Sequence, residues 1–436
     1  MAASKRLDWT SAPGTALHGE VQVPGDKSIS HRAIMFASLA DGVSRITGFL
    51  EGEDTRATAR AFAQMGVNIE TPTASERIVR GAGIDGLKAP AAAIDCGNAG
   101  TGMRLLAGLL AAQRFDSTLI GDESLSKRPM RRVTEPLAKM GAHIDTGTGG
   151  LPPLQIRGCQ SLSGIDYTLP VASAQVKSAL LLAGLYAQGE TRISEPHPTR
   201  DYTERMLHAF GWPLEFDAGH ARLTGGHRLR ATDIVVPADF SSAAFFLVAA
   251  SIVPGSDLLL RNVGINPRRT GLLRALRLMG GSISEVNRRE SGGELVADLH
   301  VRYAALRGID VPERLVPDMI DEFPALFVAA AAATGTTRVS GAAELRVKES
   351  DRIAVMAKGL QALGANIEET PDGAIIHRAP LIGGQADAKG DHRCAMSFAI
   401  AGLIAEGSVR ILDCANVATS FPGFVELANG CGFCLR

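Results

Sequence analysis

Apolar and polar positions alternate along the chain in a pattern that occurs six times. In each occurrence a small polar cluster precedes a segment that is apolar nearly all round. A short β-rich strand follows, then a segment with one polar face that usually ends at a glycine, and then one or two further strands. A helix that is apolar on every side is typical of a buried position, whereas a helix with a polar face is typical of one that covers a sheet. We therefore predict six β-α-β-α-β-β units.

The period of this pattern is roughly 70 residues, which suits one supersecondary unit per repeat. The glycines that close the amphipathic segments are Gly66, Gly141, Gly211, Gly280, Gly364 and Gly432. The apolar segments begin at KSISHRAIMFASLADG, NAGTGMRLLAGLLAAQ, SAQVKSALLLAGLYAQG, FSSAAFFLVAASIVPG, DEFPALFVAAAAATG and DHRCAMSFAIAGLIAEG. The predicted fold class is α/β (α+β), with three units in each of two domains and a division near residue 237.

Composition agrees with two packed domains, because the chain has 436 residues of which 45% are hydrophobic. A formal net charge of −1 excludes a global electrostatic attraction for nucleic acid or for an anionic membrane. The apolar runs, of about 13 residues, are too short to span a bilayer. The first residues, MAASKRLDWTSAPG, lack the apolar stretch of a signal peptide. Any anionic ligand must therefore be bound by a local cluster of charge.

Cysteine usage is sparse, with Cys96, Cys159, Cys394, Cys414, Cys431 and Cys434. Such usage is typical of a reducing compartment, so we expect a cytoplasmic protein without a disulfide scaffold. Cys431 and Cys434 have the spacing of a redox pair, but no second pair with zinc-like spacing accompanies them. We expect neither a redox centre nor a metal site.

Basic residues gather where the predicted helices begin. Lys27 and Ser28 open the first apolar helix within VPGDKSISHR, and Arg32 follows about one turn later. The lysine is not that of a nucleotide-binding P-loop, because Asp26 stands where that motif requires glycine, so a kinase is not expected. Helix N-termini carry unpaired N–H groups and a partial positive charge, and added cations there predict an anion site.

The other helix starts are similar. Their polar and basic residues are Asn98, Gly100 and Thr101 in the second apolar helix, Ser173 and Gln175 in the third, Asp391 and Arg393 in the sixth, and Lys127, Arg128, Arg200, Lys348 and Arg352 at the amphipathic helices. So many cations in a near-neutral chain predict a small ligand with several negative charges, such as two phosphates or a phosphate and a carboxylate. The alternative is that Ser28, Asn98, Ser173 and Asp321 are ordinary helix N-caps.

Three carboxylates are the nearest to these basic groups, namely Asp321, Glu322 and Glu349. A carboxylate among cations keeps its charge and can act as a base. For Glu322 we favour a structural salt bridge instead. We interpret His31 and His392, which adjoin the basic motifs, as hydrogen-bonding neighbours rather than as catalysts.

Six motifs stand in the order and spacing of one family: PGDKSISHR, GNAGTGMRLL, SKRPMRR, SAQVKSALLLAG, ELRVKESDR and DHRCAMSF. From about Gly19 to the C-terminus the chain resembles the 5-enolpyruvylshikimate-3-phosphate synthase family, and SAQVKSA and MIDEFP are similar to its class II branch. The resemblance implies the two-domain enolpyruvyl transferase fold, with buried helices of shared direction inside sheets. Residues 1–22 and 238–436 would form one domain and residues 23–237 the other, with the ligand site in a cleft that closes between them.

The resemblance implies transfer of the enolpyruvyl group of phosphoenolpyruvate to the 5-hydroxyl of shikimate 3-phosphate, with release of phosphate. By motif, the shikimate 3-phosphate contacts would be Lys27, Ser28, Arg32, Ser173, Gln175, Arg200, Asp321 and Lys348. The phosphoenolpyruvate contacts would be Lys27, Asn98, Gly100, Arg128, Gln175, Arg352 and Arg393. Asp321 matches the family's proton acceptor for the 5-hydroxyl, and proton transfer at C3 falls to Glu349 or to Lys27.

Two positions bear on how this chain compares with others of the family. Many members carry a lysine before TFP near the C-terminus, whereas this chain has Ser420 in VATSFPGF. Some class II members carry alanine at the position of Gly100, which crowds the inhibitor glyphosate. We therefore expect the present chain to be more sensitive to glyphosate than its Gly100→Ala variant.

Two other functions stay open as alternatives. A related transferase that acts on UDP-N-acetylglucosamine shares the architecture but typically uses a cysteine on a mobile loop, and no cysteine here lies in a comparable loop. A non-catalytic repeat protein that binds phosphorylated ligands would need no carboxylate at Asp321 or Glu349. The resemblance implies no cofactor and no metal. We expect a monomer whose partners are its two small-molecule substrates, without nucleic acid or membrane.

Overall fold

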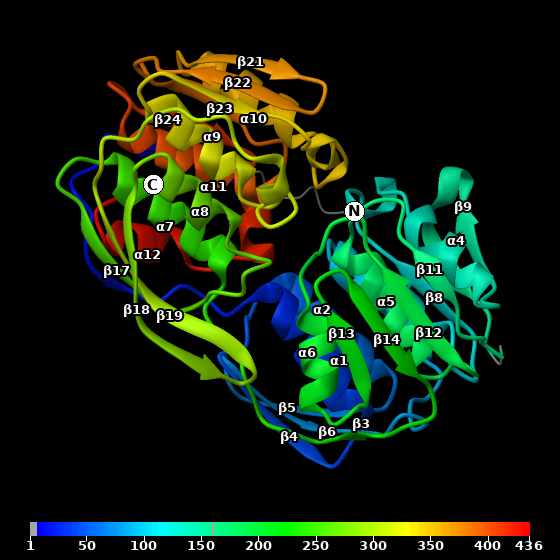
Figure 1. Cartoon of the computed structure of the whole chain (residues 1–436). Helices are drawn as coiled ribbons and strands as arrows, with labels where there is room; N and C mark the ends of the chain where they lie inside the picture. Colours follow the sequence, from blue (N-terminus) through cyan, green and yellow to red (C-terminus); the bar gives the residue numbers. More distant parts are fainter. Residues whose placement is uncertain (1–6, 159–160) are drawn as a thin grey trace. The chain divides into compact units, whose positions relative to one another are not determined.

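The computed structural model describes residues 7–158 and 161–436 and divides them into two compact units (Figure 1). Unit 1 takes the residues up to Pro24, Pro237–Glu290 and Leu295–Arg436, and unit 2 takes Gly25–Val236 and Ser291–Glu294. We predicted divisions after residues 22 and 237, and the units change over after Pro24 and Val236. Cys159 lies outside the described residues, and the five described cysteines are free thiols.

Each repeat of unit 2 contributes one four-stranded sheet, in the orders β16-β4-β6-β5, β7-β8-β10-β9 and β11-β12-β14-β13. In every one the first two strands are parallel and the remaining pairs are antiparallel. The strands are β4 (Val43–Thr47), β5 (Asn68–Thr73), β6 (Glu76–Arg80), β7 (Ile94–Asp95), β8 (Ser117–Ile120), β9 (Ile144–Gly147), β10 (Leu151–Ile156), β11 (Asp166–Thr168), β12 (Glu190–Ser194), β13 (Leu214–Asp217), β14 (His220–Thr224) and β16 (Ile234–Val235), with a separate parallel pair of β3 (Ala40–Asp41) and β15 (Leu229–Arg230).

Unit 1 has three sheets in the orders β18-β19-β17-β2, β20-β22-β21 and β23-β24-β1-β25. Its strands are β1 (Trp9–Ala12), β2 (His18–Val21), β17 (Asp257–Gly264), β18 (Ser282–Ser291), β19 (Glu294–Arg302), β20 (Thr336–Val339), β21 (Asn366–Thr370), β22 (Gly373–His377), β23 (Gly384–Asp387), β24 (Val409–Leu412) and β25 (Cys434–Leu435). The N-terminal segment completes this unit, because β1 pairs with β24 and β25 and β2 pairs with β17.

The six apolar segments form the six buried helices that the sequence predicted. They are α1 (Lys27–Leu39), α3 (Gly100–Leu110) and α5 (Ala174–Gly184) in unit 2, and α7 (Phe240–Ile252), α9 (Phe323–Ala332) and α11 (His392–Leu403) in unit 1. Every residue of α7 and of α11 is buried. Figure 1 shows α7, α9 and α11 inside unit 1, with strands β21 and β22 outside them. The predicted fold class is confirmed.

The amphipathic segments form the second helix of each repeat: α2 (Glu53–Gln64), α4 (Arg131–Lys139), α6 (Tyr202–Ala209), α8 (Gly271–Leu278), α10 (Arg352–Ala362) and α12 (Phe424–Gly430). Each ends two residues before the predicted glycine, and all six glycines have positive φ, from 79° at Gly211 to 124° at Gly432. Glycine adopts this left-handed conformation without a Cβ penalty, which explains the regular stop.

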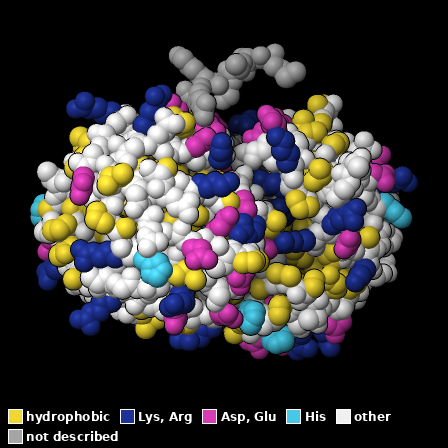
Figure 2. Space-filling view, turned by 90° about the horizontal axis from the view of Figure 1, so that it is seen from above, with side chains coloured by type: hydrophobic (Ala, Val, Ile, Leu, Met, Phe, Trp, Pro, Cys, Tyr) yellow, Lys and Arg dark blue, Asp and Glu magenta, His cyan; other side chains and the backbone are white. Residues whose placement is uncertain are grey.

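Short 3-10 turns complete the described structure: η1 (Leu125–Lys127), η2 (Thr148–Gly150), η3 (Glu313–Leu315), η4 (Ala343–Val347) and η5 (Ala415–Thr419). Among the described residues, the helices include none with the length and apolar character that crossing a membrane requires. Figure 2 shows Lys and Arg side chains interspersed with Asp and Glu over the face that it draws, as a net charge near zero leads us to expect.

The closest helix contact in unit 2 yields a prediction about stability. A Cβ atom added at Gly108 of α3 would lie 2.1 Å from the carbonyl oxygen of Ala179 in α5, so that the two backbones would have to separate. We expect Gly108→Ala to lower the free energy of unfolding by about 1–3 kcal/mol in urea titrations. Gly430→Ala is the control, because nothing lies within 4 Å of its added Cβ and alanine favours the helix there. Equal stability of the two variants would contradict the prediction.

Candidate active site

The first turn of α1 carries the lysine of the opening motif. Asp26 is the N-cap of this helix, because its Oδ1 accepts a hydrogen bond from the backbone N–H of Ile29 at 2.8 Å. Lys27 follows directly, and its Nζ lies 3.0 Å from Oδ2 of Asp54. The side chain of Lys27 is largely buried, so this amine is held in place by an ion pair at the start of the helix.

Arg32 lies one turn further into α1 and is buried. Its Nε donates to Oγ1 of Thr203 at 2.7 Å, its Nη2 donates to Oγ of Ser178 at 2.8 Å, and its Nη1 donates to the carbonyl oxygen of Ser28 at 2.9 Å. Burial, together with the charge of Arg200, lowers the pKa of Arg32 to about 10. Two like charges acting on each other favour an anionic ligand beside them.

The second repeat places Arg128 beside the start of α3. Nη2 of Arg128 donates to Oδ1 of Asn98 at 2.7 Å and to Oγ of Ser124 at 3.0 Å. A Cβ atom at Gly100 would lie 3.1 Å from Nη1 of Arg128 and 3.2 Å from Nη1 of Arg104. The helix therefore begins against two guanidinium groups, and glycine leaves space between them.

Arg104 is a residue that the sequence analysis missed. Its Nη1 donates to Oε1 of Gln175 at 2.7 Å, and Nε2 of Gln175 donates to Oγ1 of Thr101 at 2.9 Å. These bonds join the starts of α3 and α5. The signal was available in the repeat, since Arg104 lies about one turn into α3 as Arg32 lies about one turn into α1.

The N-cap interpretation is wrong at three of its four positions. Ser173 does cap α5, since its Oγ accepts from the backbone N–H of Val176 at 3.4 Å. Ser28 lies inside α1, Ala99 rather than Asn98 is the N-cap residue of α3, and Glu322 rather than Asp321 is that of α9. Capping therefore does not explain Ser28, Asn98 or Asp321.

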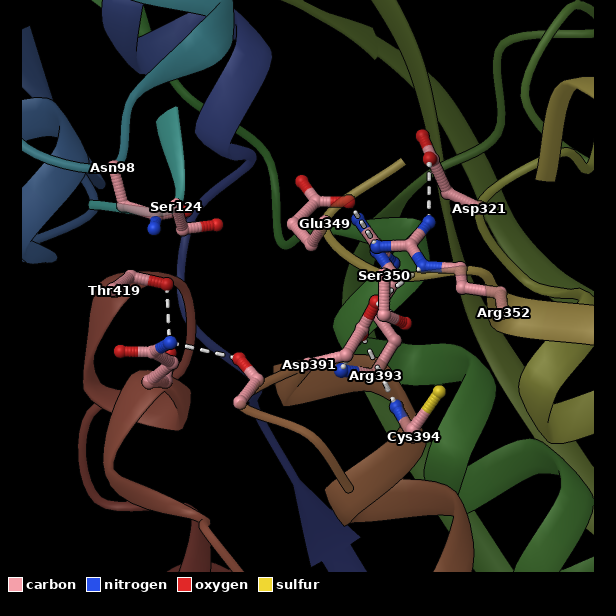
Figure 3. A network of polar contacts seen from close by, with 12 residues as sticks. Asn98, Ser124, Asp321, Glu349, Ser350, Arg352, Asp391, Arg393, Cys394 and Thr419 are labelled. Atoms are coloured by element: carbon pink, nitrogen blue, oxygen red, sulfur yellow. Dashed lines mark hydrogen bonds and ion pairs between the residues drawn. The ribbon is translucent and has the colours of Figure 1, made fainter. Parts of the chain in front are cut away.

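Unit 1 gathers its site residues around Arg352, which is 1% exposed. Figure 3 shows its guanidinium among carboxylates that come from different segments. The Arg352 nitrogens lie 3.4 Å from Oδ1 of Asp321, 2.6 Å from Oε2 of Glu349 and 2.9 Å from Oδ2 of Asp391. Burial by itself lowers the pKa of Arg352, but the charges of Asp391, Glu349 and Asp321 outweigh burial and raise it.

Asp391 connects this cluster to α11. Its Oδ1 accepts from the backbone N–H groups of Arg393 at 2.9 Å and Cys394 at 3.3 Å, so it caps the helix. Its Oδ2 accepts from Oγ of Ser350 at 3.1 Å as well as from Arg352 (Figure 3). One carboxylate thus fixes the start of α11 against the segment that precedes α10.

The remaining candidates of unit 1 are buried or partly buried. Burial lowers the pKa of Lys348, and the charge of Asp321 acts in the opposite direction. Glu322 forms the salt bridge that we favoured, with its Oε1 at 2.8 Å from Nη1 of Arg269, and Nη1 of Arg393 lies 3.9 Å from the same oxygen. Arg269 was not among the predicted residues.

Ser420 is buried at the end of η5, and its hydroxyl has no hydrogen-bond partner within the described part of the chain. Its backbone N–H donates to the carbonyl oxygen of Val417 at 3.1 Å. Across residues 7–158 and 161–436, histidine, cysteine and carboxylate side chains form no group of three or more that could hold a metal ion.

The fold is one that an enolpyruvyl transferase of known structure also has. The enolpyruvyl transferase NikO from Streptomyces tendae superposes with a TM-score of 0.79 over 98% of both chains, and at 17% identity this likeness shows that the two share a fold.

The family follows from closer relatives. The sequence matches EPSP synthase (3-phosphoshikimate 1-carboxyvinyltransferase) over residues 11–427. A 3-phosphoshikimate 1-carboxyvinyltransferase of Xanthomonas oryzae pv. oryzae (strain PXO99A) is 71% identical over 434 residues, which cover 100% of this chain and 99% of the relative. The structure of EPSP synthase from Acinetobacter baumannii has a TM-score of 0.89 at 52% identity and covers 99% of each chain. The chain belongs to the EPSP synthase family, so the family predicted from its motifs is confirmed, and its class is transferase.

The surroundings of His31 yield a prediction about pH. Its Nδ1 lies 2.7 Å from Oγ1 of Thr58, as expected of a hydrogen-bonding neighbour, and burial lowers its pKa to about 3, aided by the charges of Lys27 and Arg32. The unfolded chain then binds a proton below pH 6.5 that the folded chain does not, so stability falls as the pH falls. Between pH 6.5 and pH 5 the free energy of unfolding should fall in the unchanged chain. In His31→Gln we expect this fall to be smaller by about 2 kcal/mol. Parallel losses in urea titrations would contradict this.

Proposed function

We propose that the chain transfers the enolpyruvyl group of phosphoenolpyruvate to the 5-hydroxyl of shikimate 3-phosphate, giving 5-enolpyruvylshikimate 3-phosphate and phosphate by addition and elimination. The observation that carries the proposal is the guanidinium of Arg352, which is shared by three carboxylates near helix starts, those of Asp321, Glu349 and Asp391. A family member with buried cations and neighbouring carboxylates has both the charge for polyanionic substrates and groups that can exchange protons with them.

Shikimate 3-phosphate is proposed to bind mainly to unit 2. Arg32 and Arg200 carry like charges that a phosphate would separate, which supports their role as phosphate ligands. The proposed contacts of shikimate 3-phosphate are Lys27, Ser28, Arg32, Ser173, Gln175 and Arg200 of unit 2, and Asp321 and Lys348 of unit 1.

Phosphoenolpyruvate is proposed to bind through guanidinium groups of both units. Arg128 is held by Asn98, and Arg352 by its three carboxylates, so both groups are oriented before the ligand arrives. The proposed contacts of phosphoenolpyruvate are Lys27, Asn98, Gly100, Arg128, Gln175, Arg352 and Arg393.

Proton transfer is proposed to need two groups. Asp321 accepts the proton of the 5-hydroxyl as that oxygen attacks C2, and a proton reaches C3 from Glu349 or Lys27. The tetrahedral adduct then loses a proton from C3 as its bond from C2 to the phosphate oxygen breaks, which restores the double bond and releases phosphate. Glu349 and Asp321 share Arg352, so the two carboxylates belong to one electrostatic cluster. Fixed charges of this kind stabilise a transition state without reorganising.

We also propose that the protein acts as a monomer in the cytoplasm, without nucleic acid or membrane. Sparse free thiols and a formal net charge of −1 support this part of the proposal.

Phosphate release tests the reaction and its proposed base. Purified protein with phosphoenolpyruvate should release phosphate when shikimate 3-phosphate is added and should not when UDP-N-acetylglucosamine is added. Asp321→Asn should lower kcat by about 10²–10⁴, because the base is lost, while both ligands still bind in calorimetry. Asp310→Asn is the matched control, since this carboxylate is 81% exposed. Release only with the UDP sugar, or full activity of Asp321→Asn, would contradict the proposal.

Gly100→Ala tests the phosphoenolpyruvate contacts. The added methyl would press on the guanidinium groups of Arg128 and Arg104. We expect the inhibition constant for glyphosate to rise by a larger factor than KM for phosphoenolpyruvate, because the bulkier inhibitor needs the space that glycine leaves. An unchanged inhibition constant in steady-state assays would sink this idea. Gly430→Ala should leave both constants as they are.

A further inference from the structure

We propose that Arg269 is a positioning residue for this reaction, which holds the segment carrying Asp321 and keeps that carboxylate charged. The inference rests on the proposed function, in which Asp321 accepts the proton of the 5-hydroxyl. Arg269 lies in unit 1, two residues before α8, and is 4% exposed. A guanidinium buried to this extent requires partners of opposite charge or strong hydrogen bonds.

Arg269 contacts the starts of two buried helices. Its Nη1 lies 2.8 Å from Oε1 of Glu322 and 3.7 Å from Oδ2 of Asp321, the two residues that precede α9. Its Nη2 lies 3.3 Å from Oδ1 of Asp239, the N-cap of α7, and donates to Oγ of Ser241. Ser241 in turn donates to Glu322, so one guanidinium joins α7 to α9.

The backbone fixes Arg269 relative to the segment of the base. The backbone N–H of Gly271 donates to the carbonyl oxygen of Asp318 at 3.1 Å. A Cβ atom at Gly271 would lie 2.8 Å from Cβ of Met319, so only glycine allows this approach. Arg274 of α8 also pairs with the carboxylate of Asp318. The turn that carries Arg269 and the segment that leads to the base are therefore locked together.

The two oxygens of Asp321 face different guanidinium groups. Nη1 of Arg352 lies 3.4 Å from Oδ1, and Nη1 of Arg269 lies 3.7 Å from Oδ2. The other charged groups around Asp321 are Lys348, Glu322 and Glu349, with Asp239, Asp391 and Arg393 one contact further away. A cation this close favours the ionised carboxylate, and an anion disfavours it.

The repeat supports the assignment independently. Arg200 stands two residues before α6, Arg269 stands two residues before α8, and Arg352 begins α10. An arginine thus stands at the start of the second helix, or two residues before it, in the third, fourth and fifth repeats, and only that of the fourth repeat has no role in our sequence-based reasoning. In that repeat the arginine serves a carboxylate rather than a ligand.

Charge variants of the full-length enzyme test the proposal through the pH dependence of kcat, measured as phosphate release at saturating substrates. Asp321 must be charged to accept a proton, so kcat falls as the pH falls through the titration of this group. Arg269→Gln removes a cation. We expect the acidic limb of its kcat–pH profile, where kcat falls with falling pH, to move to higher pH by about 0.5–1 pH unit. Glu322→Gln breaks the same ion pair but removes an anion, and we expect its limb to move down.

Opposite shifts separate positioning from mere packing. Two variants that only loosened the fold would shift the limb in the same direction or not at all. Arg269→Lys keeps the charge but loses the planar fork, so its limb should stay in place while kcat falls. Arg274→Gln is the matched control on α8, because it breaks the pair with Asp318 and does not face Asp321. Its limb should not move.

The outcomes are distinct from those that test the proposed function. An unchanged enzyme that releases no phosphate with shikimate 3-phosphate would overturn the proposed function itself. An active enzyme whose limb is the same in Arg269→Gln and Glu322→Gln would overturn the role of Arg269 alone. If Arg269→Gln fails to fold, Glu322→Gln and Arg269→Lys still test the proposal. An acidic limb that does not shift in Glu322→Gln contradicts it.

Discussion

The burial of arginine near the starts of helices is the constraint on which the site in each unit depends. A guanidinium stays protonated in proteins, so a buried one must be satisfied by hydrogen bonds or by carboxylates. Removing one partner of a buried ion pair costs about 3–5 kcal/mol, which makes such clusters strict about their geometry. Arg32 and Arg352 meet the constraint in two different ways, and the difference separates the chemistry of the two units.

In unit 2 the acceptors of Arg32 are the hydroxyls of Thr203 and Ser178 and a backbone carbonyl. Neutral acceptors satisfy the N–H groups but add no negative charge, so burial and the charge of Arg200 lower the pKa of Arg32 to about 10. In unit 1 the acceptors of Arg352 are three carboxylates, and its pKa is raised. Arg32 is thus held by neutral acceptors, whereas Arg352 is held by carboxylates.

The sequence was sufficient to predict whatever a local pattern encodes. The buried helices, the glycines that end the second helices and the motifs at the helix starts follow from periodicity and from residue type, and these agree with the structure. Contacts between distant segments were not accessible in this way. Arg32 and Thr203 are 171 positions apart, and Arg269 and Glu322 are 53 apart, so no local spacing indicates that they meet. The alternative that Ser28 is an ordinary cap is wrong, because Asp26 occupies the cap.

The cluster of unit 1 draws its groups from three successive repeats, since Asp239 precedes α7, Asp321 precedes α9 and Asp391 precedes α11. These three helices are almost entirely buried, and the carboxylates stand one or two residues before them. A close-packed core transmits displacements because its side chains have little free volume. The distances between the charged groups are therefore set by the packing of these helices in the core. It follows that a cavity in α9 far from Asp321 can alter the distance from Asp321 to Arg269 and to Arg352, and so the electrostatic environment of this carboxylate, without changing any residue of the cluster.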